Sequence, residues 1–434
     1  MITAQDIAQD IAIRRAASPI VPAVPVPATA FSERLLLVVL YITVLASSFA
    51  FVEPSPHDAL MGVLALACLI AGVRFERPVA LLFLLLLIWN VAGLLSLLNV
   101  PGQEQTVQYA GTSIYLAVAA MIFAGLFSQN TLPRLAAMRA AYILSALLTT
   151  LFGLAVYFHF LPGEDTFMWA GRLRSTFKDP NVFGPFLILP ALFLIEDMVT
   201  RRIQLWKIAA TLIMLAGLLF SFSRGAWFNY AVSAVVLLAL IFCTAPTPSA
   251  RMRPIVLAVV SAVGLALLLV ALLSFESVRA MLLERAQLTQ SYDVGEGGRF
   301  GLQGVALGLL LDKPFGLGPF EFSRMHGGTQ QHNVYLQAFL VYGWAGGISY
   351  IMLILTTLFV GLRNALLRTP WQSYLIAACA AFVGILCESF IIDSDHWRHF
   401  FLTLGMIWGL SAATIKFTHA EQGANSIRPI WVAA

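Results

Sequence analysis

Charged residues are scarce in this sequence. Of its 434 residues, 11% are Asp, Glu, Lys or Arg, whereas about 25% is usual in a soluble globular protein. Apolar residues make up 59% of the chain, and the mean hydropathy is +0.84. This composition excludes a soluble enzyme, a nucleic-acid binder and a disordered chain. The net charge is only +4, so no polyanionic partner is expected.

Cysteines and catalytic signatures are also few. The four cysteines lie inside apolar runs without a CxxC pair, so we expect small core residues rather than disulfides or metal ligands. The sequence contains no zinc-ligand cluster and no GxSxG motif, so no metal and no covalent serine are expected. Prolines interrupt the short apolar stretch near the N-terminus, which argues against a cleavable signal peptide.

Long apolar runs, in contrast, are abundant. Runs such as 78–98 and 254–275 have the ~20 residues that a helix needs to cross a ~30 Å hydrocarbon core. Hydropathy predicts an all-α polytopic integral membrane protein with about twelve transmembrane helices. The predicted helices cover residues 35–51, 58–73, 78–98, 107–127, 136–160, 181–199, 206–222, 225–244, 254–275, 334–361, 372–392 and 399–416.

Lys and Arg are unevenly distributed between the connecting segments. With the N-terminus in the cytoplasm, 16 of the 26 fall on the cytoplasmic side, and the outer loops 52–57 and 99–106 have none. The positive-inside rule therefore predicts that both termini are cytoplasmic. The chain then divides into a tail over 1–34, a single transmembrane domain over 35–416 and a tail over 417–434.

Two outer loops, 161–180 and 276–333, carry most of the remaining cations. Asp179 and Pro180 predict a helix start at the end of the first loop, with Asp179 as its N-cap. In the second loop, the apolar stretch 300–311 is too short to span a membrane and predicts an interfacial or packed helix. The positive-inside rule disfavours cations in outer loops, so their presence there favours an anionic ligand on the outer face. The alternative for the longer loop is solubility, since its six acids roughly balance its five bases.

Three outer segments combine cations with groups able to do chemistry. They are 171–181 (GRLRSTFKDPN), 221–225 (SFSRG), and the pair His332 and Asn333, which Gly343 and Gly346 follow. Ionisable residues are rare within the predicted spans, whereas transporters usually place them near the midplane. The pattern therefore favours chemistry at the outer surface.

These motifs resemble the O-antigen ligase and Wzy-type polymerase superfamily of bacterial envelopes. The spacing from His332 and Asn333 to Gly343 and Gly346 matches the motif that describes the family's ligases. The segment 171–181 is similar to the family's first periplasmic arginine motif. Two further segments match the family. Ser223-Arg224-Gly225 resembles its second arginine motif, and Gly298-Arg299 resembles the approach to its histidine. Together the matches follow the family's order over about 160–350.

The resemblance implies transfer of a glycan from a polyprenyl diphosphate to an acceptor sugar hydroxyl, without metal or cofactor, on the periplasmic side of the bacterial inner membrane. Arginine offers a permanently charged, bidentate fork to phosphate oxygens, and histidine is suited to accept a proton near pH 7. His332 is accordingly the candidate base. The candidate diphosphate ligands are Arg174, Arg224, Arg172 and Arg299, and the candidate supporting residues are Asn333, Asp179, Asn181, Gly343 and Gly346.

Some of these assignments have alternatives. Arg174 is favoured over Arg172 because it is adjacent to the Ser-Thr-Phe segment, yet both lie in the same loop. His332 could merely cap the helix that follows it, and Arg224 could be an interfacial anchor.

Two activities within the resemblance remain open. The segment 179–184 (DPNVFG) favours a polymerase that joins O-antigen or exopolysaccharide repeat units, whereas the histidine motif favours a ligase that transfers glycan to lipid A-core. The polymerase is the preferred prediction, and a lipid-linked glycan transporter is the least favoured. The implied partners are a polyprenyl-diphosphate-linked oligosaccharide, a glycan or lipid A-core acceptor, the bilayer and a chain-length regulator.

Overall fold

The computed structural model describes residues 31–426 except 275, 288–292 and 296. Residues 1–30, for which the sequence predicts a tail without a signal peptide, lie outside the described residues, as do 427–434.

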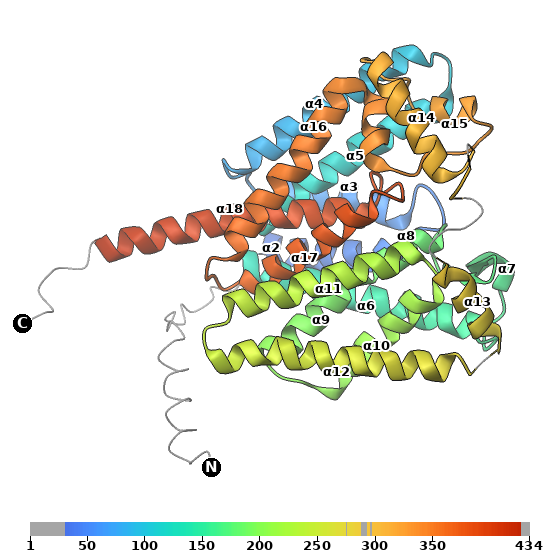
Figure 1. The fold of residues 1–434 in the computed structure, drawn as a ribbon. Coiled ribbons are helices and arrows are strands. Elements are labelled where there is room, and N and C mark those ends of the chain that lie inside the picture. The colour runs from blue at the N-terminus through green and yellow to red at the C-terminus, as the bar shows by residue number, and fades with distance from the viewer. Residues whose placement is uncertain (1–30, 275, 288–292, 296, 427–434) are drawn as a thin grey trace, which may run out of the picture.

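Helices make up most of the described chain (Figure 1). The longer ones are α2 (Phe31–Leu45), α3 (Pro56–Ile70), α4 (Val79–Ser96), α5 (Glu104–Phe127), α6 (Thr131–Tyr157), α9 (Ile188–Thr200), α10 (Leu205–Phe220), α11 (Arg224–Thr244), α12 (Pro248–Leu272), α16 (Val334–Ala365), α17 (Gln372–Glu388) and α18 (Arg398–Ser426). Within the described residues, eight helical segments are long and apolar enough to cross a membrane. The chain is therefore an all-α polytopic membrane protein, as the sequence predicts, while the number of spans and the side of each terminus stay predictions.

Shorter elements occupy the two long outer loops. The first loop holds α7 (Glu164–Phe167) and an antiparallel hairpin of β1 (Met168–Trp169) and β2 (Arg172–Leu173), and it leads into α8 (Pro180–Phe186). The second loop holds α13 (Glu276–Ala286), α14 (Arg299–Asp312) and α15 (Glu321–Met325). The predicted helix over 300–311 is therefore confirmed as α14. Asp179 caps α8 by accepting a hydrogen bond from the Asn181 N–H at 2.7 Å, as its sequence predicts.

Two boundaries differ from the sequence prediction. The expected helix over 181–199 is divided into α8 and α9, which meet at Leu187. The last helix does not end at residue 416 but continues to Ser426, so the first part of the expected C-terminal tail is helical. Hydropathy locates the end of the apolar run, which is not the end of the helix. Residues 417–422 contain no proline or glycine that would interrupt the helix, so it continues into the polar segment.

Small residues allow close packing in the helical core. α18 packs against α5, α11 against α17, and α16 against α4. A Cβ on Gly405 would lie 2.4 Å from the Ala120 carbonyl oxygen, and one on Gly409 would lie 2.6 Å from that of Ala124. Because lipid tails are as apolar as side chains, such close backbone approach is a main source of helix association in membranes.

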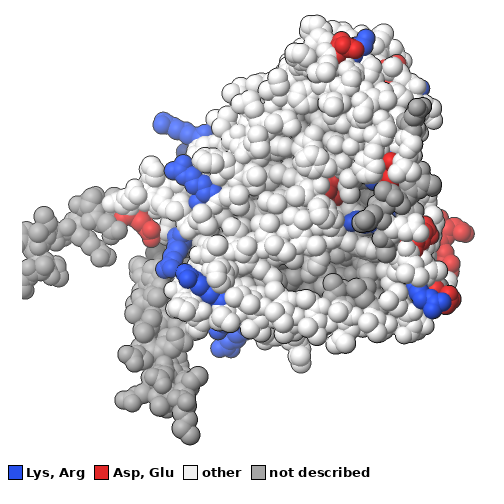
Figure 2. Space-filling view, in the orientation of Figure 1, with Lys and Arg blue, Asp and Glu red and all other residues white. Residues whose placement is uncertain are grey.

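Charge is segregated between the two ends of the molecule. On the face that Figure 2 shows, Lys and Arg line the edge from which α18 projects, and most of the surface beyond them carries no charged residue. Toward the opposite edge, acidic and basic residues occur together. Figure 1 places α7, α8, α13, α14 and α15 at that opposite end, so the two outer loops lie on one side of the bundle.

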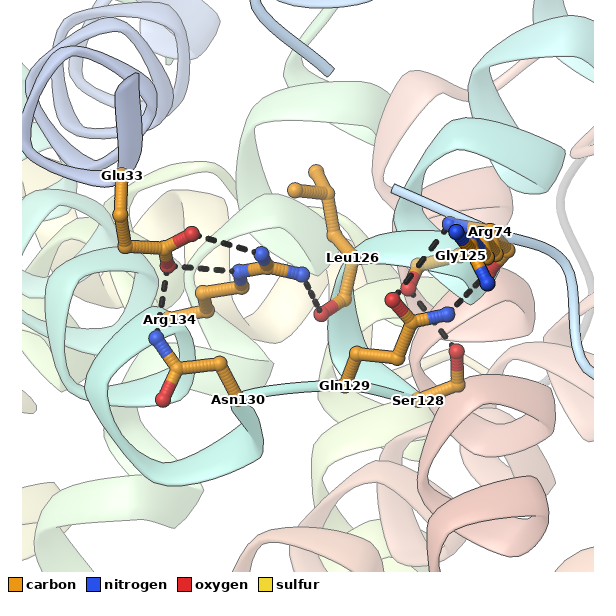
Figure 3. Close-up of polar contacts among 8 residues, drawn as sticks. All are labelled: Glu33, Arg74, Gly125, Leu126, Ser128, Gln129, Asn130 and Arg134. Atoms are coloured by element: carbon orange, nitrogen blue, oxygen red, sulfur yellow. Dashed lines mark hydrogen bonds and ion pairs between the residues drawn. The ribbon is translucent and has the colours of Figure 1, made fainter. Parts of the chain in front are cut away.

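A buried arginine joins three helices at the basic end (Figure 3). Arg134 on α6 is 3% exposed and donates two hydrogen bonds to the Glu33 carboxylate of α2, at 3.0 and 2.8 Å. A third bond, at 3.0 Å, goes to the carbonyl oxygen of Leu126 on α5, and Asn130 Nδ2 donates to Glu33 at 2.7 Å. Two nitrogens of the guanidinium therefore bind Glu33 of α2 and the third binds α5, which explains how this charge is tolerated in an apolar environment.

Candidate functional site

A cavity of about 670 Å³ lies among the elements of the two outer loops. This volume is typical of small-molecule sites, which occupy roughly 300–1,000 Å³. Its wall is apolar in part, with Trp169, Trp227 and Phe300 among the lining residues. The lining residues that carry ionisable groups are Arg172, Asp179, Arg224, Asp293, Arg299, His332 and Glu388. Segments far apart in the sequence thus bring three arginines and one histidine to one cavity.

Arg172 is held in the cavity wall by fixed acceptors. It lies on β2, is 7% exposed, and donates from Nε to the Ser221 carbonyl oxygen at 3.0 Å. Its Nη2 donates to Asn181 Oδ1 at 2.7 Å. The Asn181 N–H in turn bonds to Asp179, so the helix cap of α8 also orients the amide that binds the arginine. Asp179 and Asn181 therefore hold Arg172 in place.

Arg174, the arginine that the sequence favoured, does not line this cavity. Its Nε donates to the Thr166 carbonyl oxygen at 3.1 Å and its Nη1 to that of Lys178 at 3.2 Å. The chain turns after β2, where Ser175 has a left-handed φ of 49°, and the two arginines consequently lie in different surroundings. Adjacency to the Ser-Thr-Phe segment was a poor guide because a hairpin, which the sequence did not reveal, orients the loop.

Arg224 and Arg299 share one buried carboxylate. Arg224 begins α11 and donates from Nη2 to Asp293 Oδ2 at 2.7 Å and from Nη1 to the Gln287 carbonyl oxygen at 3.0 Å. Arg299 begins α14, with its Nη1 3.4 Å from Asp293 Oδ1. The Asp293 side chain is only 2% exposed. Two guanidinium groups thus meet at one carboxylate on the cavity wall, and guanidinium groups suit the binding of phosphate oxygens.

His332 forms a pair with Asp393. Its Nδ1 lies 2.8 Å from Asp393 Oδ2, and its side chain is 37% exposed. Since a carboxylate only accepts, Nδ1 carries the hydrogen of the neutral ring, and Nε2 keeps its lone pair. The imidazole is therefore oriented to accept a proton at Nε2.

Three chain segments hold this pair together. His332 has a left-handed φ of 46°, and the following Asn333 caps α16 by accepting from the Leu336 N–H at 3.2 Å. The Val334 N–H donates to the Ser389 carbonyl oxygen at 3.0 Å, which ties the start of α16 to the loop after α17. Gln303 on α14 donates to the carbonyl oxygens of both Gln331 and Phe390, each at 3.2 Å.

The two motif glycines serve packing rather than the cavity. α16 is interrupted at Gly343, where φ is 67° and ψ is −172°, and a Cβ there would lie 2.5 Å from the Pro314 carbonyl oxygen. The Trp344 N–H donates to that oxygen at 2.8 Å. A Cβ on Gly346 would lie 3.3 Å from that of Ala92 on α4. The glycines therefore position the first part of α16, which His332 precedes.

The loop between α17 and α18 carries a second polar group near His332. Asp395 accepts from Tyr109 Oη at 2.9 Å and lies 3.1 Å from His396 Nδ1. Burial opposes ionisation of Asp395, but His396 and Tyr109 outweigh it and hold the pKa of this carboxyl below its usual range. This network stabilises the loop that presents Asp393. A smaller cavity of about 140 Å³ lies beyond it, lined in part by His57, Trp397 and His399.

Sequence reasoning missed Asp293 and Asp393. Both are distant in sequence from the groups that they bind, so no local pattern pairs them. Asp293 could have been noticed as an acid within the glycine-rich approach to Arg299, and Asp393 as an acid just beyond a predicted span. No group of three or more His, Cys, Asp or Glu residues within the described ranges could hold a metal ion.

One comparison with known proteins bears on this site. Residues 209–351 match the family model described as O-antigen ligase. The matched segment contains Arg224, Asp293, Arg299 and His332, whereas Arg172 and Asp393 lie outside it. No curated protein matches the sequence significantly.

Proposed function

We propose that this chain, whose residues 209–351 match the O-antigen ligase family model, transfers a glycan from a polyprenyl diphosphate to a sugar hydroxyl in the 670 Å³ cavity. The observation that carries the proposal is the His332–Asp393 pair on the wall of a cavity that Arg172, Arg224 and Arg299 also line. The His332–Asp393 pair suits abstraction of a proton from the acceptor hydroxyl. The arginines suit the binding of a phosphate-bearing leaving group.

The arginines bind the donor. A diphosphate leaving group gains negative charge as the bond to the sugar breaks, and fixed guanidinium groups stabilise that charge without reorganisation. A preorganised donor aimed at developing charge contributes roughly 3–4 kcal/mol to transition-state stabilisation in a water-poor site. Arg172 supersedes Arg174 in this role because Arg172 lines the cavity.

His332 activates the acceptor. Its Nε2 takes the proton of the acceptor hydroxyl as that oxygen forms a bond to the anomeric carbon of the donor sugar. The bond between that carbon and the diphosphate oxygen breaks, and the polyprenyl diphosphate leaves with the bonding electron pair. Asp393 stabilises the imidazolium that forms. This sequence of steps requires no metal ion.

The cavity faces the periplasm in this proposal, and the protein resides in the bacterial inner membrane. The segregation of Lys and Arg at the end from which α18 projects supports this orientation, because positive residues are retained in the cytoplasm.

Polymerisation of O-antigen or exopolysaccharide repeat units is the activity that we favour. The segment 179–184, in which Asp179 and Asn181 support Arg172, is the sequence feature that favours it. Ligation to lipid A-core is the second candidate, favoured by the description of the matching family model and by the motif at His332. A chain-length regulator is an expected partner of the polymerase only.

Reconstituted transfer tests both candidates. Purified protein is incubated with polyprenyl-diphosphate-linked repeat units, alone or with lipid A-core. A polymerase produces a ladder from repeat units alone, whereas a ligase yields product only with lipid A-core. Replacement of Arg224 by Ala should abolish either product, and replacement by Lys should remove most of it because the bidentate fork is lost. Unchanged product with Arg224→Ala at equal protein amount would refute the assignment of the donor site.

A further inference from the structure

Glu388 is a buried carboxyl group on the cavity wall with no cationic partner among the residues that the structure describes. It ends α17 and is 0% exposed, and its Oε2 accepts one hydrogen bond, from Asn229 Nδ2 of α11 at 2.7 Å. In the described part of the chain, Oε1 has no hydrogen-bond partner, and no Lys, Arg or His lies within 4.0 Å of the carboxyl group. Burial of an ionised carboxylate without a counter-charge is very costly, so the neutral acid is the stable form.

The hydrogen bonds around Glu388 determine which oxygen carries its proton. Ser233 Oγ donates to Asn229 Oδ1 at 3.0 Å, so the amide carbonyl of Asn229 faces Ser233 and its amino group faces Glu388. Glu388 Oε2 is therefore an acceptor. The proton of the neutral acid then resides on Oε1, the oxygen without a protein partner.

Two glycines make room for this arrangement. A Cβ on Gly225 would lie 2.7 Å from Glu388 Oε1, and Gly225 directly follows Arg224 and also lines the cavity. On the opposite helix, a Cβ on Gly384 would lie 2.0 Å from Ser233 Oγ and 2.2 Å from Asn229 Oδ1. Both α11 and α17 therefore lack side-chain volume where these hydrogen-bonded side chains pass between them, which brings Oε1 against Gly225, the residue that follows Arg224.

We infer that Glu388 is a neutral carboxylic acid whose Oε1–H donates a hydrogen bond to the diphosphate of the lipid-linked donor, beside Arg224. The inference rests on the proposed function for the identity of the ligand. A neutral O–H adds a hydrogen-bond donor without adding charge, whereas a carboxylate at this position would repel the diphosphate that the arginines attract. Glu388 thus acts in donor binding and is distinct from the proton acceptor, His332.

The test compares Glu388→Gln with Glu388→Ala in the full-length protein. Glutamine is neutral, keeps an N–H donor and has nearly the same shape, so its affinity for undecaprenyl diphosphate and its transfer rate should stay within about threefold of the wild type. Alanine removes the donor, and affinity should fall roughly 10- to 100-fold, as expected for a hydrogen bond to a charged group. Glu321→Gln is the matched control, because Glu321 lies on α15, outside the cavity, and pairs with Arg324.

Infrared spectroscopy measures protonation independently of activity. The wild type should show a carbonyl stretch of a protonated carboxyl group that is absent in Glu388→Gln and present in Glu321→Gln. Absence of that band in the wild type, or a Glu388→Gln variant as defective as Glu388→Ala, would overturn the inference. Equal affinity of Glu388→Ala and wild type for undecaprenyl diphosphate, with equal thermal stability, would overturn it as well. A wild type that shows the band but transfers no glycan would contradict the proposed function and not the protonation of Glu388.

Discussion

Each candidate arginine ligand of the diphosphate is held by a fixed acceptor before any substrate binds. Arg172 binds Asn181 and a carbonyl oxygen, and Arg224 and Arg299 bind Asp293. Orienting these flexible side chains in advance reduces the entropy lost on binding. Asn181 and Asp293, which hold the arginines, should therefore affect the affinity for the donor nearly as much as the arginines themselves.

Arg172 and Arg174 provide a direct comparison within one loop. Arg172→Ala should weaken donor binding roughly 10- to 100-fold, because a charge-assisted contact to phosphate is lost. Arg174→Ala should leave donor affinity within about twofold of the wild type, since that side chain lies outside the cavity and binds carbonyl oxygens of its own loop. Binding of undecaprenyl diphosphate to the purified variants measures both effects. The reverse ranking would restore Arg174 as the ligand.

The His332–Asp393 pair predicts a loss of turnover without a loss of donor affinity. His332→Gln should reduce the transfer rate by roughly 10²- to 10⁴-fold, because glutamine cannot accept the proton. Asp393→Asn should reduce it by about 10- to 100-fold, because the amide no longer stabilises the imidazolium.

Single-turnover transfer and equilibrium binding of the donor separate these effects. Glu321→Gln is the matched control, since Glu321 lies outside the cavity and pairs with Arg324. Full activity of His332→Gln would reduce His332 to a helix-capping role. Loss of donor binding in that variant would place His332 among the diphosphate ligands.

At the scale of elements, the interrupted helix α16 determines where the histidine lies. The interruption at Gly343 lies against the connection between α14 and α15, where the Leu317 N–H also donates to the Leu340 carbonyl oxygen of α16 at 2.6 Å. A straight helix of the same length would direct its first turns elsewhere. The spacing between His332 and Gly343 therefore reflects one structural unit. It consists of the turn at His332 and the first half of α16, which ends where Gly343 contacts the backbone of Pro314.

Gly343→Ala should destabilise this unit. The backbone of Gly343 lies in a region that only glycine adopts readily, which costs other residues about 1–3 kcal/mol, and the added Cβ would lie 2.5 Å from the Pro314 carbonyl oxygen. We expect a lower midpoint of thermal unfolding in detergent and reduced transfer. Gly308→Ala on α14 is the control, because its Cβ would meet nothing within 4 Å. An unchanged midpoint for Gly343→Ala would show that α16 can repack without this contact.

At the scale of the whole molecule, the bundle separates a basic end from an end that holds the cavity. The hydrogen bonds of Glu33, Arg134 and Asn130 join α2 and α6 toward the first end, and α8, α11 and α14 contribute to the cavity wall at the second. This polarity underlies the proposed orientation in the membrane.

Cysteine labelling tests that orientation. In a background without the native cysteines, Thr329→Cys should react with an impermeant reagent in intact spheroplasts, because residue 329 lies in the outer loop 276–333 and is exposed. Ser249→Cys, which is also exposed but lies in the first turn of α12, should react only after the membrane is permeabilised. Labelling of Ser249→Cys but not of Thr329→Cys in intact spheroplasts would invert the topology and remove the periplasmic site.

Hydropathy and local signals were sufficient for much of the architecture. Apolar runs predicted the helices because a span must bury its own backbone polar groups, and the Asp179 cap and α14 followed from short-range rules. The arginine and histidine motifs could be recognised because family resemblance resides in contiguous residues.

The composition of the cavity wall depended on long-range packing. Asp293 with Arg224, Asp393 with His332, and Glu388 with Asn229 each join residues more than 60 positions apart. Local sequence cannot specify such pairs, because the helices between them determine which loops meet. The choice of Arg172 over Arg174 at the cavity depended in turn on a two-residue hairpin and the turn that follows it, which are too short to leave a periodic pattern.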